Sequence, residues 1–491
     1  MSLGKRANAE VESAHSKQMK VDTEQAWDAE SEEEEETMDE VAAVCDQVSD
    51  LYLDTINRSN LDFDFEQQCS VSLSTTNIYA CLVCGKYYQG RGPKTHAYFH
   101  SINDDHHVFI NLESRQAYIL PDNCKINSKS LNDIKQVISP QYSKLAIASL
   151  DSQERQAFDL QGKPYLPGYV GLNRIKRNSF MNVVIQLLAH VEPLRNMLLS
   201  SEEGVGKQPD VLLSKLSLLV RKIWHAQKFK AHVSPHELVQ EIVSLSKKRF
   251  RLDQEGDPYE LLIWLLNTLH IHLGGTRKRN SSIVYQAFQG EMLKKDGQAD
   301  RKMPFLALSL ELPPKPLFTN TSLDDPDDRA EIPQVPLMTL LQRYGSTQPE
   351  QTSMFQLTRL PQYIICHIKR FQKNEFAVEK NPTVVNFPVR SLPFGQLLPQ
   401  NTREMRGRDT TYDLVINICH VGEQLPQSSP DAAQPDVTAE TTGSGESPFM
   451  VYIRNEANGK WFMLHDLQVK PIMPQMLFLS DSYIQVWKRN D

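Results

Sequence analysis

The hydrophobic positions of this chain change their spacing once, after about residue 273. Before that point, apolar residues recur every three or four positions, as on one face of a helix, over residues 178–199, 209–227 and 257–273. Asn178 is a candidate N-cap of the first of these helices. Beyond it, apolar and polar residues alternate, as in strands, over residues 304–312, 363–371, 411–421, 449–455 and 460–469. Helices followed by strands predict an α+β domain over residues 165–490, with a helical lobe packed on an antiparallel sheet.

Charge separates the N-terminus from the rest of the chain. The net charge is −8, but residues 1–50 hold fifteen acidic and four basic side chains, a balance of −11, which leaves +3 for the remainder. We therefore expect residues 1–60 to be a mostly disordered acidic tail. Residues 425–447, rich in Ser, Pro, Ala and Thr, predict a mobile loop.

The cysteines and the hydropathy of the chain indicate in which kind of cellular compartment the protein works. Seven scattered cysteines, an odd number, favour a reducing environment over a disulfide framework. No run of eighteen apolar residues occurs, and the N-terminus has no apolar signal core, so we expect neither secretion nor a membrane partner.

A small Cys/His-rich unit is predicted between residues 61 and 160. Cys81 and Cys84 have the two-residue gap that lets two thiolates grip one tetrahedral zinc ion. Downstream histidines could complete the site, and spacing alone permits either His96 with His100 or His100 with His106. We expect one structural Zn²⁺.

A stretch at residues 171–186, GLNRIKRNSFMNVVIQ, resembles the nucleophile box of the ubiquitin-specific proteases, roughly GLxNxGNTCYMNSxLQ. Ser179 stands at the position of that family's cysteine, and Arg174 at the position of its oxyanion-stabilising asparagine. Further resemblances, DQEGDPYELLIWLLNTLH (253–270) and LPQYIICHIKRF (360–371), imply the family's papain-like fold with a fingers extension.

The remaining catalytic positions of that family are also changed. In SPFMVY (447–452), Pro448 stands at the position of the catalytic histidine, and in WFMLHD (461–466), His465 stands at that of the orienting acid. A serine without a positioned base is a poor nucleophile. We therefore predict that the chain is not an enzyme, and that Arg174, Ser179, Pro448 and His465 are degenerate positions.

The Cys/His unit resembles the ubiquitin-binding type of zinc finger that occurs in several members of the family. That resemblance implies that Cys81, Cys84, His100 and His106 are the zinc ligands. The residues near the family's ubiquitin-tail pocket, Arg91, Tyr87 and Tyr88, fit its pattern only loosely.

The combination of one finger with a degenerate protease domain resembles the spliceosomal homologues of the family. The resemblance implies a nuclear, non-catalytic scaffold in pre-mRNA splicing that assembles or stabilises the tri-snRNP through protein contacts. The basic clusters at 247–251 and 277–279 are more typical of solvated faces than of RNA sites, so RNA contact is expected to be mainly indirect. The alternatives are an active or specialised deubiquitinase and a reader that binds ubiquitin without cleaving it.

Overall fold

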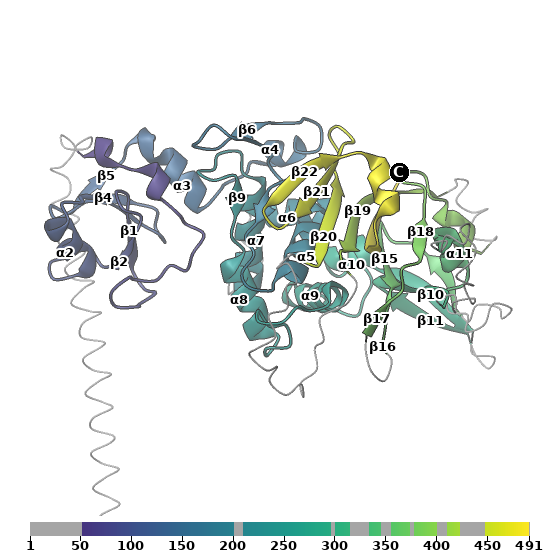
Figure 1. Cartoon of the computed structure of the whole chain (residues 1–491). Coiled ribbons are helices and arrows are strands. Elements are labelled where there is room, and N and C mark those ends of the chain that lie inside the picture. Colours follow the sequence, from purple (N-terminus) through teal and green to yellow (C-terminus); the bar gives the residue numbers. More distant parts are fainter. Residues whose placement is uncertain are drawn as a thin grey trace, which may run out of the picture. The chain divides into compact units, whose positions relative to one another are not determined.

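A computed structural model of the chain describes residues 52–200, 210–295, 300–314, 333–344, 355–373, 378–399, 410–422 and 447–490. Its contacts divide the chain into two compact units, Met1–Ile138 and Ser139–Asp491, and Figure 1 shows their elements. Most of the predicted acidic tail, and the predicted loop near 425–447, lie outside the described residues. None of the described helices is long and apolar enough to cross a bilayer.

The first unit is built on a small antiparallel sheet with the strand order β2-β1-β3-β4-β5. Buried side chains such as Tyr79 and Phe109 form its core, and helix α2 packs against β2. Its elements are β1 Ile78–Cys81, β2 Tyr87–Gln89, α2 His96–Asn103, β3 Val108–Asn111, β4 Ala117–Ile119, β5 Cys124–Ile126 and α3 Asn132–Ile138, with short 3-10 turns η2 Leu53–Thr55, η3 Arg58–Asn60 and η4 Lys129–Leu131.

The second unit begins with the predicted helical lobe. The helices are α4 Lys144–Ala148, α5 Ser179–His190, α6 Glu192–Leu199, α7 Val211–Trp224, α8 His236–Leu245, α9 Pro258–His272, α10 Ile283–Phe288 and α11 Leu337–Gln342. The periodic stretch 178–199 forms two helices, because Val191 is extended and Pro193 has no N–H for the carbonyl of Ala189. That carbonyl accepts a hydrogen bond from the indole of Trp224 instead, at 2.9 Å.

A seven-stranded sheet, with the order β12-β15-β23-β19-β20-β21-β22, lies against this lobe (Figure 1). Its strands are β12 Ala307–Glu311, β15 Tyr363–Lys369, β19 Tyr412–His420, β20 Phe449–Arg454, β21 Trp461–His465, β22 Gln468–Ile472 and β23 Ser482–Arg489. The pairing is antiparallel as predicted, except that β12 runs parallel to β15.

Alternation along β15 shows how the sheet divides the core of this unit. Ile365 points into the cluster shared with the helical lobe, whereas Ile364 and Cys366 point into a second cluster on the opposite face. This is the two-residue period expected of a strand. Both faces are covered, so the strands are almost wholly buried.

The fingers extension is a separate three-stranded sheet of β10 Gly290–Lys295, β11 Asp300–Phe305 and β14 Phe355–Arg359. The predicted strand 304–312 is divided between β11 and β12. The remaining strands form short pairs: β6 Ala157–Phe158 with β7 Pro164–Tyr165, β8 Gly171–Leu172 with β9 His232–Val233, β13 Gln334–Pro336 with β18 Val384–Asn386, and β16 Phe371–Lys373 with β17 Val378–Lys380.

A fully buried arginine joins the end of β15 to the surrounding loops. Arg370 donates to the carbonyls of Ser482, Asn381 and Thr383 at 2.6, 3.1 and 2.8 Å. Burial lowers the pKa of its guanidinium. Since buried carbonyls need partners, this one side chain holds together two backbone segments, the loop at 381–383 and the start of β23.

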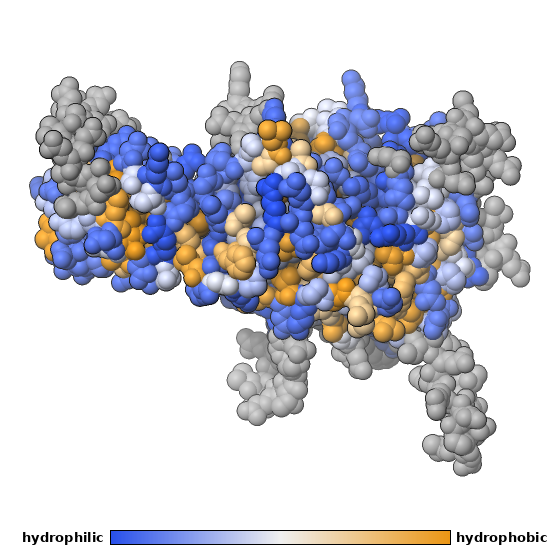
Figure 2. Space-filling model, turned by 90° about the horizontal axis from the view of Figure 1, so that it is seen from above, coloured by the Kyte–Doolittle hydropathy of each residue, from blue (hydrophilic) through white to orange (hydrophobic). Residues whose placement is uncertain are grey.

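The surface seen in Figure 2 has hydrophilic residues around small groups of hydrophobic ones. Scattered apolar side chains of this kind are normal on a folded protein.

Candidate functional site

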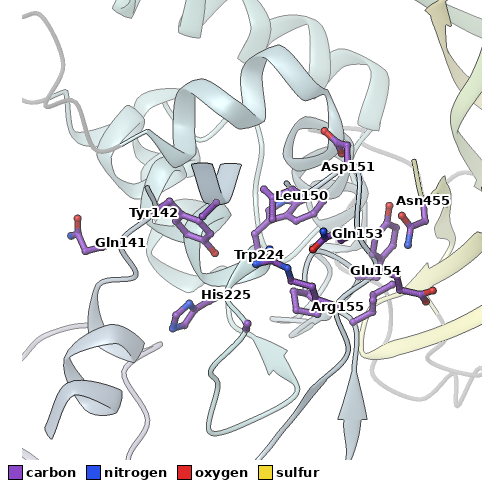
Figure 3. A pocket seen from close by; sticks show the side chains of 15 residues that line it. Gln141, Tyr142, Leu150, Asp151, Gln153, Glu154, Arg155, Trp224, His225 and Asn455 are labelled. Atoms are coloured by element: carbon purple, nitrogen blue, oxygen red, sulfur yellow. The ribbon is translucent and has the colours of Figure 1, made fainter. Parts of the chain in front are cut away.

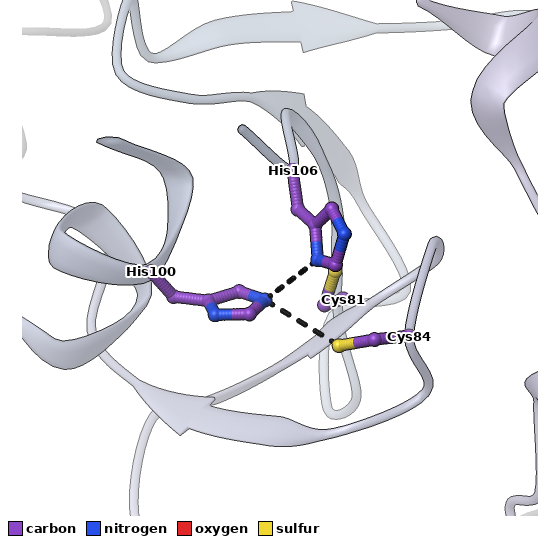
Figure 4. A group of neighbouring side chains, drawn as sticks. All are labelled: Cys81, Cys84, His100 and His106. Carbon is purple, nitrogen blue, oxygen red and sulfur yellow. Dashed lines mark hydrogen bonds between the residues drawn. The ribbon is translucent and has the colours of Figure 1, made fainter. Parts of the chain in front are cut away.

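Four predicted ligands of the first unit come together. One donor atom from each of Cys81, Cys84, His100 and His106 lies within 4.8 Å of every other (Figure 4). Nε2 of His100 lies 3.4 Å from Sγ of Cys84 and 3.0 Å from Nδ1 of His106. Two thiols and two imidazoles at this spacing fit the donor set of a tetrahedral zinc site.

Local structure explains how the four donors meet. Cys81 ends β1 and Cys84 follows in the next turn, where the N–H of Gly85 bonds to the carbonyl of Cys81 at 2.9 Å. Gly85 has φ of +77°, and a Cβ there would lie 2.2 Å from the carbonyl oxygen of Asn60. Only glycine fits this turn without moving the backbone.

Of the two histidine pairs that spacing allows, the tertiary structure brings His100 and His106 to the cysteines. His100 lies on the buried face of α2, and its Nδ1 is 2.5 Å from a carboxylate oxygen of Asp104, which leaves Nε2 facing the cluster. A carboxylate on the outer nitrogen is the usual support of a metal-bound histidine. His96, the alternative from spacing, is not part of the cluster.

The two thiols are electrostatically coupled. The hydrogen bond from Cys81 lowers the pKa of Cys84 to about 4, and the same bond raises the pKa of Cys81. A pair that shares one proton in this way holds negative charge where a cation would bind.

The side chains near the positions of the family's ubiquitin-tail pocket, Arg91, Tyr87 and Tyr88, make contacts within the unit. Arg91 is 7% exposed, lies over the ring of Tyr118 and donates to Asn123 at 2.7 Å. The hydroxyl of Tyr87 donates to a backbone carbonyl, and Tyr88 stacks on His100. The latter two contacts join these tyrosines to the fold around the Cys/His cluster.

Ser179, at the position of the protease nucleophile, is fully buried at the start of α5. Its hydroxyl donates to Oε2 of Glu255 at 3.1 Å, and Oε1 of Glu255 is 3.5 Å from the guanidinium of Arg174. Burial raises the pKa of Glu255, although the bond from Ser179 and the charge of Arg174 oppose this rise. Two of the degenerate positions therefore meet on one buried carboxylate.

Sequence reasoning missed Glu255. A signal was present, since alignment of EGDPYELL with the family's QQDAxEFL puts Glu255 at the first glutamine. The neighbouring Gly256 is needed because a Cβ there would lie 2.7 Å from the ring of Phe180. Asp257 then caps α9 by accepting from the N–H of Tyr259 at 2.7 Å.

The other two degenerate positions lie on adjacent strands. Pro448 precedes β20, and His465 ends β21 with Nε2 at 2.9 Å from the carbonyl of Ser447. Asp466, in the left-handed region at φ of 49°, accepts from the amide of Asn182 at 3.0 Å. Hydrogen bonds thus join Ser179 to Glu255, and His465 to a backbone carbonyl.

The two thiols described in this unit do not have the properties of a nucleophile. Cys366 and Cys419 are buried in β15 and β19, and burial raises the pKa of both, that of Cys419 to about 12. A thiol that stays protonated is a poor nucleophile.

A small cavity of about 160 Å³ lies elsewhere in the second unit (Figure 3). Tyr142, Leu150, Trp224 and His225 are among its lining residues. Neither Ser179 nor the other degenerate positions line it. The cavity is small beside ordinary ligand sites, which span roughly 300–1,000 Å³.

Each of the two units matches a known protein family. Residues 170–487 match the family described as ubiquitin carboxyl-terminal hydrolase. Residues 69–131 match the Zn-finger in ubiquitin-hydrolases and other protein.

Two relatives are similar over almost the whole chain. Ubiquitin carboxyl-terminal hydrolase 39 of Mus musculus is 43% identical over 476 residues, which covers 90% of this chain and 80% of that protein. Pre-mRNA-splicing factor SAD1 of Saccharomyces cerevisiae is 31% identical over 459 residues, with 90% and 93% covered.

A solved structure agrees with these matches. The crystal structure of an essential yeast splicing factor superimposes with a TM-score of 0.71 at 29% identity, over 90% of this chain and 100% of that chain. The predicted α+β protease fold and the resemblance to the spliceosomal homologues are confirmed. The chain therefore belongs to the ubiquitin carboxyl-terminal hydrolase family, as a homologue of the splicing factor Sad1 with a zinc-finger domain of the family's type.

Proposed function

We propose that the chain is a non-catalytic scaffold of nuclear pre-mRNA splicing, which assembles or stabilises the tri-snRNP through protein–protein contacts. The splicing context rests on the similarity to proteins named as splicing factors. The absence of catalysis rests on the surroundings of Ser179, Pro448 and His465.

The buried bond between Ser179 and Glu255 is the observation that carries this proposal. A nucleophile must reach a carbonyl carbon and pass its proton to a base. Ser179 is 0% exposed, and the carboxylate that accepts its hydrogen bond is itself paired with Arg174. Pro448 has no side-chain group that could accept a proton, and His465 bonds to a backbone carbonyl. Loss of nucleophile and base together forfeits a factor on the order of 10⁶ for a comparable triad.

The Cys/His cluster has a structural role in this proposal. Cys81, Cys84, His100 and His106 would hold one zinc ion, with Asp104 orienting His100. A site with four protein ligands leaves no open position for substrate, which is typical of structural zinc.

Purification from nuclear extract tests the scaffold role. The full-length tagged chain should co-purify with the tri-snRNP small RNAs and core proteins at moderate salt. Recovery of ubiquitin conjugates in their place would contradict the proposal.

A cleavage assay tests the absence of catalysis separately. Neither the wild type nor Ser179→Cys should release a fluorophore from the ubiquitin C-terminus or react with ubiquitin vinyl sulfone. The new thiol would face the carboxylate of Glu255 with no histidine to activate it. Labelling of the wild-type chain would favour the deubiquitinase alternative, and saturable binding of free ubiquitin without cleavage would favour the reader.

A further inference from the structure

Two segments that are distant in the sequence, each with basic side chains, meet in the second unit. The N–H of Arg177, in the loop before α5, bonds to the carbonyl of Leu252 at 3.0 Å. The loop that contains Leu252 continues from the basic stretch at 247–251. Lys176 lies close enough to Asp253 in the same loop to lower the pKa of that carboxyl, after the larger effect of Arg251. The sequence alone showed only separate short clusters.

Within the described part of the chain, some of these basic side chains form ion pairs with carboxylates, and others do not. Arg249 pairs with Glu260, Arg251 with Asp253 and Arg174 with Glu255. Of the seven basic side chains in these loops, three are thus paired with a carboxylate of the described residues and four are not. The four exposed residues without an ion pair among the described residues form what we call the basic surface: Lys176, Arg177, Lys247 and Lys248.

Helix dipoles account for the positions of only two of these four basic residues. Lys247 and Lys248 follow the C-terminus of α8, where the helix dipole favours cations. Lys176 and Arg177 are in a loop that precedes a helix, where the dipole of α5 disfavours them. Lys176, Lys247 and Lys248 also have φ of 59°, 53° and 63°, a region that asparagine or glycine occupies at lower cost.

We propose that the basic surface binds the phosphate backbone of RNA, without reading its base sequence. Three of the four arginines in these loops are already paired with carboxylates. Three of the four groups that remain are lysines, which act as point charges toward phosphate. Phe250, the aromatic residue of the basic stretch, is 4% exposed. The basic stretch 247–251 therefore offers no exposed aromatic ring on which a base could stack. The inference goes beyond the scaffold role, because it adds direct RNA contact.

The salt dependence of binding has a defined magnitude. Four phosphate contacts on a single strand give a slope of log affinity against log salt of about −2.8. Affinity should then fall about 50-fold between 50 and 200 mM salt. With Arg177 alone remaining, the slope is about −0.7 and the fall about threefold.

The experiment uses fluorescence anisotropy of a labelled 20-nucleotide oligouridine with the full-length chain. The test variant carries Lys176→Asn, Lys247→Asn and Lys248→Asn. Asparagine tolerates the left-handed backbone of all three positions, so this variant should fold at least as well as the wild type. The slope of log affinity against log salt for this variant should fall to about −0.7, the value for one phosphate contact.

A matched control removes the same number of charges from the exposed cluster after α9, by Arg277→Asn, Lys278→Asn and Arg279→Asn. This control should keep the wild-type slope. Equal slopes for the wild type and the test variant would overturn the proposal, as would an equal loss in the control. Tighter binding of an oligoglutamate peptide than of RNA at the same salt would also overturn it, because it would identify an acidic protein segment as the partner.

Discussion

The substitution Arg174→Ala tests whether the degenerate catalytic centre has become a structural ion pair. It leaves the carboxylate of Glu255, which is 7% exposed, without the cation at 3.5 Å. The hydrogen bond from Ser179 remains. A buried charge that loses its partner destabilises the folded state.

The expected loss follows from distance and exposure. At 3.5 Å and an effective dielectric constant of ~20, the attraction is about 5 kcal/mol. The side chain of Arg174 is 26% exposed, so water screens much of this energy, and we expect a net loss of about 2 kcal/mol. The double variant Arg174→Ala with Glu255→Gln should recover most of it, because no uncompensated charge remains.

The loss should depend on pH. Burial raises the folded-state pKa of Glu255 above its unfolded value, so the folded state binds the proton more tightly. This contribution to stability is fully present below the unfolded pKa and is lost as pH rises through the folded pKa. Removal of Arg174 raises the folded pKa further. The deficit of the variant should therefore be smaller at pH 5 than at pH 8.

Urea denaturation followed by tryptophan fluorescence measures the effect. Four tryptophans, Trp224, Trp264, Trp461 and Trp487, lie in the second unit and report on its unfolding. With a slope of about 3 kcal/mol per molar urea, the midpoint should fall by about 0.7 M.

A matched control is the exposed pair of Arg249 and Glu260, at 2.9 Å with side chains 54% and 55% exposed. Arg249→Ala should change the stability by about 0.5 kcal/mol or less. The reasoning is refuted if Arg174→Ala matches the wild type, or if the double variant is no more stable than Arg174→Ala.

Three further predictions concern single positions. Elemental analysis should find one equivalent of zinc in the wild type and none in Cys84→Ser, and a normal zinc content in this variant would contradict the site. Gly256→Ala should cost about 1–3 kcal/mol in urea denaturation, because its Cβ would press on the ring of Phe180 at 2.7 Å; an unchanged midpoint would show that the ring moves freely. Arg370→Met should cost about 3 kcal/mol or more, since three backbone carbonyls lose their donor, and a loss below about 1 kcal/mol would show that water replaces it.

Much of the second unit could be predicted from local pattern. Apolar spacing located α7 and α9 to within a few residues, and alternation located β15, β19 and β20, whereas the predicted strand 460–469 is divided between β21 and β22. The pattern missed the division of residues 178–199, because Val191 and Pro193 keep the apolar spacing while the backbone turns. Apolar periodicity indicates which residues are buried, but it does not indicate whether the backbone hydrogen bonds of a helix continue.

The candidate sites divide in the same way. The sequence by itself determined the donor types at Cys81 and Cys84, and the loss of acid–base chemistry at Pro448, since a residue's functional groups are fixed by its identity. Spacing alone left His96 and His106 open, and the tertiary structure brings His106 to the cluster; it also joined Ser179 to Glu255, 76 positions away. It also brought Arg177 to the basic loop near Leu252. Such pairings depend on how helices and strands pack across the chain, and no local spacing encodes the distance between side chains that meet only after folding.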